Sequence, residues 1–323
     1  MIRRGFSWIG PVAFLAVALL AARFAHAQNP VQWMGNPRMA IDRAAEHSMP
    51  LMFWITEHED VLDDDDVRDA QSRAFRDPTV VALAQKRFVP VRVSRNNSVV
   101  MQEATKLGLP TDHGLYIAVI SPEGKLIRTI NPGDVANAEA LAVHLLEALH
   151  AYLDDLYTTR LKPVITDPER PKAEVRKAVQ TVWRLGILTA DADCVALLKR
   201  PDLSDTERSR LCTMLGALAT PPCIEALLDL AAQGDKVAIQ GLEQAEAGAL
   251  ATLLKALPTA EQPPDARQIA AYRAACRIAR VPMKPDTFWP EAQPQQRSEA
   301  LDALRRRAEP ILEYWSETTG QWR

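Results

Sequence analysis

Apolar and polar residues in the first half of the chain follow the pattern of alternating strands and helices. Met49–Thr56 is a continuous apolar run, which predicts a central strand buried on both faces. Phe88–Ser94 alternates as a strand does, and Leu115–Ser121 is a second apolar run. The turn Ser-Pro-Glu-Gly at 121–124 predicts a hairpin with Lys125–Ile130. This order predicts parallel strands joined by helices, with one terminal hairpin, in an α/β sheet covered on both faces.

Helical periodicity fills the intervals between these strands. Arg38–His47 carries apolar residues on one side. Asp77 and Pro78 have the residue types of an N-cap and a first helical position, so they predict a helix at 78–86. Further helices are predicted at Asp63–Phe75, Val99–Leu107 and Asn137–Tyr152.

The second half of the chain is almost purely helical in pattern. Ala173–Gly186 and Asp205–Leu218 resemble each other at a spacing of 32 residues (173 to 205), and each precedes a second helix. Helix pairs at such a period predict an α-solenoid, whereas an irregular helical bundle is the alternative. The other predicted helices are Asp191–Lys199, Pro221–Ala232, Ile269–Val281 and Gln296–Thr318, with a weaker third unit at Lys236–Leu257 and an irregular interruption at Pro285–Gln295.

Residues 1–27 have the three parts of a secretory signal peptide. Two arginines precede the apolar run Trp8–Ala22, and Ala-His-Ala at 25–27 fits a cleavage site. An uncleaved anchor is the alternative, but the run has 15 residues where a bilayer needs roughly 20. We therefore expect cleavage near Ala27 and Gln28, and a periplasmic or secreted protein.

Composition and charge limit the class of partner. The chain has 323 residues, of which 47% are hydrophobic, and this is enough for two modest cores. Its 38 basic and 41 acidic residues give a net charge of −3. Because there is no basic excess, we expect neither nucleic acid nor an anionic membrane surface as a partner. We also expect no stable membrane span once the leader is removed.

Proline and charged residues are concentrated at 158–172, which predicts a linker. The expected domains are therefore 28–157 and 173–323, after the leader at 1–27.

Four short motifs accompany the α/β pattern of residues 31–155. They are Leu-Met-Phe-Trp-Ile (51–55), Phe-Arg-Asp-Pro-Thr-Val (75–80), Phe-Val-Pro-Val (88–91) and Ser-Pro-Glu-Gly-Lys (121–125). With the order of the elements, they resemble an exported thioredoxin-like domain. The later helix pairs are similar to short HEAT-type repeats. The resemblance implies an α/β thioredoxin-like domain followed by an all-α, HEAT-like solenoid domain.

The resemblance also implies a Cys-x-x-Cys pair after the central strand, and this chain lacks it. Counting back from Asp77 places the pair near Asp64 and Val67, neither of which can supply a thiolate. The cis-proline that thioredoxin-like proteins place beside this pair falls at Leu115, or at Pro110 if an insertion follows it. We therefore expect no dithiol chemistry of the usual thioredoxin kind.

Seven carboxylates in residues 57–66 follow the central strand. One interpretation is a solvated helix start, because acidic side chains complement the free amides and dipole of a first helical turn. Relief of their mutual repulsion by a weakly bound hard cation is a second interpretation. A catalytic role is the third.

His58 and His113 suggest a candidate metal site. In the thioredoxin-like arrangement, the loops that carry them face each other across the former active-site corner. With Asp60 or Asp112 they could hold zinc or copper, whereas two exposed loop histidines are the alternative. No other cofactor and no catalytic residue is expected.

All four cysteines lie in apolar helical segments of the second half, without a Cys-x-x-Cys motif: Cys194, Cys212, Cys223 and Cys276. Four buried thiols are the preferred interpretation, because cysteine in such contexts behaves as a small hydrophobic residue. A disulfide between Cys212 and Cys223 is the alternative.

These features predict a non-catalytic periplasmic protein that binds or scaffolds envelope proteins or peptides on a redox-inactive thioredoxin-like fold. A metal-binding or metal-delivery protein that uses the acidic and histidine-bearing loop is the alternative from another class. Thiol oxidoreduction with cysteines from the helical half is a third interpretation.

Overall fold

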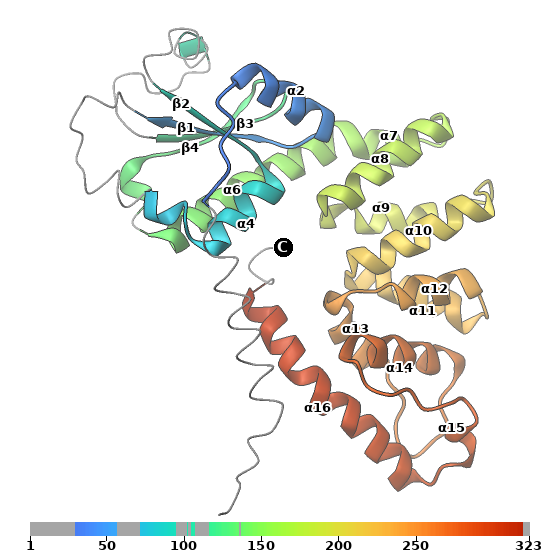
Figure 1. The fold of residues 1–323 in the computed structure, drawn as a ribbon. Coiled ribbons are helices and arrows are strands. Elements are labelled where there is room, and N and C mark those ends of the chain that lie inside the picture. The colour runs from blue at the N-terminus through green and yellow to red at the C-terminus, as the bar shows by residue number, and fades with distance from the viewer. Residues whose placement is uncertain are drawn as a thin grey trace, which may run out of the picture. The chain divides into compact units, whose positions relative to one another are not determined.

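The chain forms two compact units, which divide between Tyr152 and Leu153 (Figure 1). The first contains a small mixed four-stranded sheet with helices, and the second is mostly helical. The computed structural model describes residues 30–56, 72–94, 102, 105–106, 116–135 and 137–318.

The sheet has the strand order β2-β1-β3-β4. β1 and β2 are parallel, β3 is antiparallel to β1, and β4 is antiparallel to β3. The predicted parallel arrangement is confirmed for β1 and β2, whereas the reversed direction of β3 makes the sheet mixed. The strands are β1 (Leu51–Thr56), β2 (Val89–Ser94), β3 (Tyr116–Ile120) and β4 (Leu126–Ile130).

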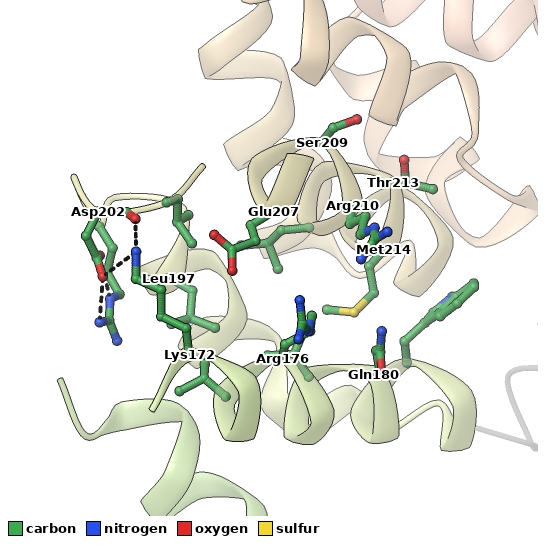
Figure 2. Close-up of a pocket in the computed structure, with 16 residues that line it drawn as sticks. Lys172, Arg176, Gln180, Leu197, Asp202, Glu207, Ser209, Arg210, Thr213 and Met214 are labelled. Atoms are coloured by element: carbon green, nitrogen blue, oxygen red, sulfur yellow. Dashed lines mark hydrogen bonds and ion pairs between the residues drawn. The ribbon is translucent and has the colours of Figure 1, made fainter. Parts of the chain in front are cut away.

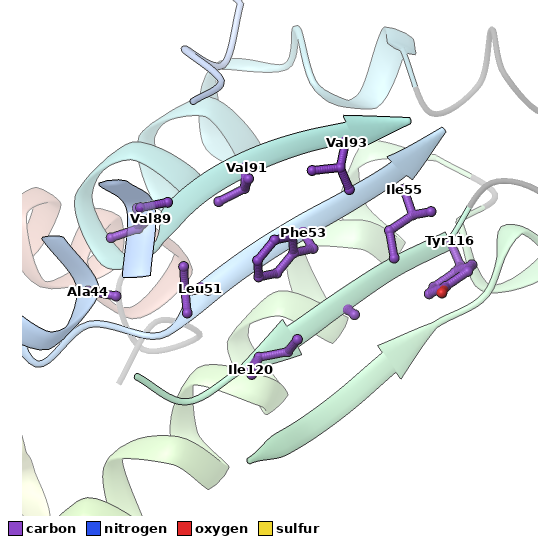
Figure 3. Packing of buried hydrophobic residues seen from close by; sticks show 11 residues of the cluster. Ala44, Leu51, Phe53, Ile55, Val89, Val91, Val93, Tyr116 and Ile120 are labelled. Carbon is purple, nitrogen blue, oxygen red and sulfur yellow. The ribbon is translucent and has the colours of Figure 1, made fainter. Parts of the chain in front are cut away.

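β1 is buried on both faces, as its continuous apolar run predicts. Figure 3 shows Leu51, Phe53 and Ile55 on one face, in a cluster with side chains of β2 and β3. On the other face Trp54 packs against Trp33 and Phe75, with ring centroids 5.2 Å and 4.9 Å away. Helix α2 lies on one side of the sheet, and α4 and the start of α6 lie on the other (Figure 1). Burial of these apolar side chains therefore fixes β1 as the central strand.

Side-chain caps define the helices of the first unit: α2 (Pro37–His47), α4 (Pro78–Arg87) and α6 (Ala138–Leu156). The carboxylate of Asp77 accepts a 2.8 Å hydrogen bond from the Thr79 amide, which confirms the predicted N-cap of α4. The Tyr152 hydroxyl donates to the Ser48 carbonyl at 2.9 Å and ties α6 to the end of α2. The predicted helices at 63–75 and 99–107 lie mostly outside the described residues.

The predicted hairpin turn before β4 is confirmed. The Gly124 amide donates to the Ser121 carbonyl at 2.9 Å. Gly124 has φ +87°, a left-handed conformation that glycine adopts without steric cost.

The second unit reproduces most of the helices that periodicity predicts, and α10 and α11 have the predicted bounds. The weaker third segment is divided into α12 and α13 by a 3₁₀ turn at Ala247–Ala249. The helices are α7 (Lys162–Thr166), α8 (Lys172–Leu185), α9 (Asp191–Leu197), α10 (Asp205–Leu218), α11 (Pro221–Ala232), α12 (Lys236–Glu243), α13 (Leu250–Lys255), α14 (Ala266–Ala279), α15 (Phe288–Glu291) and α16 (Pro294–Thr318).

Residues 158–172, expected to be a linker, are largely helical. A π-helical turn at Tyr157–Leu161 leads directly into α7. Leu161 and Ile165 are buried, and the Tyr157 hydroxyl donates to the Asp193 carboxylate. These apolar contacts order the segment in spite of its proline and charge content.

Helices α10 and α12 meet backbone to backbone. A Cβ atom placed on Gly216 would lie 2.1 Å from the carbonyl oxygen of Gly241. One placed on Gly241 would lie 2.6 Å from the carbonyl oxygen of Cys212. Only glycine allows this approach, so the pair sets the distance between the two helices.

Arg208 and Asp235 join the same two helices electrostatically. An Arg208 guanidinium nitrogen lies 2.6 Å from a carboxylate oxygen of Asp235, which is the N-cap of α12. Burial raises the pKa of the Asp235 carboxyl, but hydrogen bonds from Arg208 and from two backbone amides outweigh it and leave the pKa below its ordinary value of 3.8. The carboxylate therefore stabilises the fold in its charged form.

A buried arginine holds α16 in the unit. The Arg297 side chain is 5% exposed, and its guanidinium donates to four backbone carbonyls, which belong to Ala260, Glu261, Trp289 and Ala292. These bonds satisfy carbonyls of the loop after α13 and of α15. The four hydrogen bonds thus compensate the free-energy cost of removing the Arg297 guanidinium from water.

Replacing Gly216 by alanine is expected to destabilise the protein by about 1–3 kcal/mol, because overpacking at the α10–α12 contact exceeds the ~1 kcal/mol gained in helix propensity. Urea unfolding followed by circular dichroism measures this change. The control is Gly35→Ala, at a position with open space around it, which should change the unfolding free energy by less than about 0.5 kcal/mol. A Gly216→Ala protein that is more stable than the wild type would contradict the contact.

Replacing Asp235 by asparagine should cost about 1–2 kcal/mol of stability at neutral pH, because asparagine keeps an oxygen for the helix cap but loses the charge that pairs with Arg208. The folded-state pKa of Asp235 is lowered, so its contribution is present above pH 3.8 and is lost as the pH falls through the lower folded value. Urea unfolding of both proteins over an acidic pH series should show the difference between them shrinking. A difference that is independent of pH would show that the charge of Asp235 contributes nothing.

Candidate functional site

Helices α8 and α10 form the walls of a groove in the second unit (Figure 2). Its volume is 340 Å³, and residues between Leu197 and Leu203 close one end. Ligand pockets in proteins have volumes of about 300–1,000 Å³. The groove therefore has the size of a small ligand or of a few side chains of a larger partner.

Two rows of α8 side chains face this groove. Val175, Val179 and Trp183 recur every four residues, which places them along one line of the helix. Lys172, Arg176 and Gln180 form the adjacent row. The side of α8 that packs into the unit carries other apolar residues, namely Ala178, Val182 and Leu185. Helix α8 thus carries a second set of apolar side chains, in addition to those that pack into the unit.

The apolar part of the groove combines buried and accessible side chains. Leu211 and Met214 of α10 are buried and, with Leu197, form its base. Val179 is partly buried, and Trp183 at the rim is 51% exposed. An accessible tryptophan beside an apolar hollow is typical of a surface that binds a partner.

Asp202 neutralises basic side chains at one end of the groove. Its carboxylate oxygens lie 3.1 Å and 3.2 Å from two guanidinium nitrogens of Arg200, and 3.5 Å from the Lys172 ammonium (Figure 2). The hydrogen bond from Arg200 lowers the pKa of Asp202. Lys172 and Arg200 are therefore both ion-paired with the carboxylate of Asp202.

Glu207 is engaged in the capping box of α10. Its carboxylate accepts from the Ser204 hydroxyl at 2.7 Å and from the Ser204 amide at 3.1 Å. These bonds lower the pKa of Glu207, and the positive charges of Lys172 and Arg176 contribute less. The Glu207 carboxylate thus has its main partners on its own helix.

Arg176 and Arg210 face the groove, and although the charge of Arg176 contributes to the lowered pKa of Glu207, neither arginine is bonded to a carboxylate of the described residues. Both are exposed, and in Figure 2 their guanidinium groups point into the space between α8 and α10. Within the described parts of the chain, neither makes a hydrogen bond or an ion pair. Four basic side chains and two carboxylates line the groove, an excess of two positive charges. The groove therefore combines an apolar base with two available cationic groups.

The predicted metal site lies outside the described residues. This holds for His58, Asp60, Asp112 and His113, as well as for the acidic run at 57–66 and for Pro110. In the parts that the structure describes, no three His, Cys, Asp or Glu side chains lie together as metal ligands. Over the same residues, no helix is long and apolar enough to cross a membrane. The metal site remains a prediction.

The four cysteines are free and buried, which confirms the preferred interpretation, and Cys212 and Cys223 form no disulfide. Burial raises the pKa of the Cys194 thiol to about 12, and the nearby Cys223 raises it further. Burial also raises the pKa of Cys212 and of Cys223 to about 11. These thiols are therefore protonated at neutral pH and are poor nucleophiles.

Comparison with models of known protein families finds no match, and comparison with curated proteins finds none either. The groove itself was not predicted from the sequence. One feature of the sequence pointed to it. Val175, Val179 and Trp183 form a second apolar row on α8, in addition to the apolar side that packs into the unit.

N-Ethylmaleimide is expected to leave all four cysteines unmodified in the folded protein at neutral pH, because the thiols are buried and protonated. In concentrated guanidinium chloride, mass spectrometry should show four adducts. A Thr189→Cys variant, which places a thiol at an exposed position, serves as the positive control and should gain one adduct rapidly when folded. Rapid modification of a native cysteine in the folded protein would contradict its buried environment.

Proposed function

We propose that this protein is a non-catalytic binding or scaffolding protein of the cell envelope, which holds partner proteins or peptides in the groove between α8 and α10. The single observation that carries the proposal is the combination, in one groove, of an apolar base with two arginines that have no partner among the described residues. Desolvated apolar pockets ringed by arginine and tryptophan are the usual anchoring points of protein interfaces.

The topology of the first unit supports the thioredoxin-like part of the proposal. The parallel β1–β2 pair and the terminal β3–β4 hairpin agree with the predicted arrangement, whereas the antiparallel β3 beside β1 departs from it. Helices α2, α4 and α6 cover the sheet. In this proposal the unit is a rigid platform without redox cysteines.

The packing of the second unit supports a HEAT-like repeat. Helices α8 and α9, then α10 and α11, follow each other as successive pairs, and α10 packs on α12 while α11 packs on both α12 and α14. Stacked pairs of this kind leave one row of helices on a continuous surface, which such proteins use for binding. The α8–α10 groove lies between the first helices of two successive pairs.

Cross-linking from within the groove tests the proposed function. A photoreactive amino acid at Gln180, which is exposed and faces the groove, should cross-link to partner proteins in an envelope extract. The matched control places the same amino acid at Lys177, which is exposed on α8 but does not line the groove.

We expect adducts, resolved by gel electrophoresis and mass spectrometry, to be several-fold stronger from position 180 than from 177. Equal labelling from the two positions, or adducts from neither, would refute binding in the groove.

A further inference from the structure

We propose that the occupant of the α8–α10 groove is an acidic peptide segment, in which an apolar side chain fills the base and flanking carboxylates pair with Arg176 and Arg210. The inference rests on the proposed binding function and specifies its partner. It follows from the charges and the shape of the groove.

Charge complementarity selects an anionic partner. The carboxylate of Asp202 is already bonded to Arg200 and Lys172, and that of Glu207 to Ser204. Arg176 and Arg210, one on each wall, are left to pair with groups from outside the described chain. Guanidinium groups favour carboxylates because they donate two parallel hydrogen bonds to them.

The apolar base selects a partner that also carries a hydrophobic side chain. Leu211 and Met214 are buried, so the apolar surface that the groove exposes to water belongs mainly to Val175, Val179 and Trp183 of α8. Filling the groove with an apolar side chain removes this surface from water, which contributes roughly 25 cal/mol per Å². A simple anion would leave the exposed apolar surface of the groove hydrated, so charge alone does not describe the ligand.

A peptide matches these two requirements better than a membrane surface does. The positive charges stand on the two walls of a narrow hollow, whereas a lipid surface is attracted to basic groups that project from a broad face. In an extended peptide, residues i, i+2 and i+4 point to one side. The sequence Glu-Ser-Leu-Ser-Glu therefore presents one leucine between two carboxylates on the same side.

Fluorescence anisotropy of dye-labelled peptides on the full chain tests the inference. The probe is Glu-Ser-Leu-Ser-Glu, and the controls are Gln-Ser-Leu-Ser-Gln, which lacks the charges, and Glu-Ser-Ser-Ser-Glu, which lacks the apolar side chain. We expect saturable binding of the probe only, and weaker binding as the salt concentration rises.

Variants of the two arginines assign the binding to the groove. R176Q and R210Q should each raise the Kd of the probe about fivefold, and together about twentyfold or more. R184Q removes an exposed arginine from α8 outside the groove and should change the Kd less than about twofold. Circular dichroism of each variant checks that the fold is retained.

Charge reversal gives a result that loss of structure cannot imitate. A protein with both Arg176→Glu and Arg210→Glu should lose the Glu-Ser-Leu-Ser-Glu probe and bind Lys-Ser-Leu-Ser-Lys instead. Binding of the probe that is unchanged by R176Q and R210Q, no binding of the probe, or arginine-dependent binding of phosphatidylglycerol vesicles in its place would overturn the inference. If any of these results is obtained while the photoreactive residue at position 180 still cross-links to partner proteins, the proposed binding function stands. Only the assignment of the partner as an acidic peptide is then refuted.

Discussion

The backbone contact between Gly216 and Gly241 is the constraint on which the arrangement around the groove depends. It lies on a row of α10 that also carries Cys212 and Arg208, and this row faces α12. Residues two positions apart on a helix point about 200° away from each other. Arg210 and Met214 therefore lie opposite Arg208 and Cys212, so the contact that fixes α10 on α12 also turns its other side toward the groove.

Local hydrogen bonds decide which charges in the groove are available. The residues that begin α10 are held by a capping box, which engages the carboxylate of Glu207, one of the two that line the groove. Asp202, just before this helix, is bonded to Arg200 and Lys172. Because the acids at this end have these partners, neither is hydrogen-bonded to Arg176 on α8 or to Arg210, three residues after Glu207 on α10.

Sequence periodicity could predict where most elements begin and end, but not which of their surfaces remain uncovered. The bounds of α10 and α11 follow from apolar spacing and from Pro221 at a first helical position. Residues 158–172 were predicted to be a linker, and α7 was missed, because composition does not show that Leu161 and Ile165 are buried. The groove was missed for the same reason, since apolar residues such as Val179 and Trp183 look identical in a sequence whether a neighbouring helix or solvent faces them.

The groove is suited to selective rather than merely tight association. Its apolar base can contribute affinity to any partner with a hydrophobic side chain, because burial of apolar surface is not directional. Arg176 and Arg210 stand on helices whose backbones are fixed by packing, so little ordering of the protein is required when a partner binds. Two fixed positive charges favour acidic partners and repel basic ones, and this difference changes association rate and specificity more than overall affinity. The selectivity of the proposed binding function therefore depends on the arginine side chains that the ion pairs of the groove leave unused.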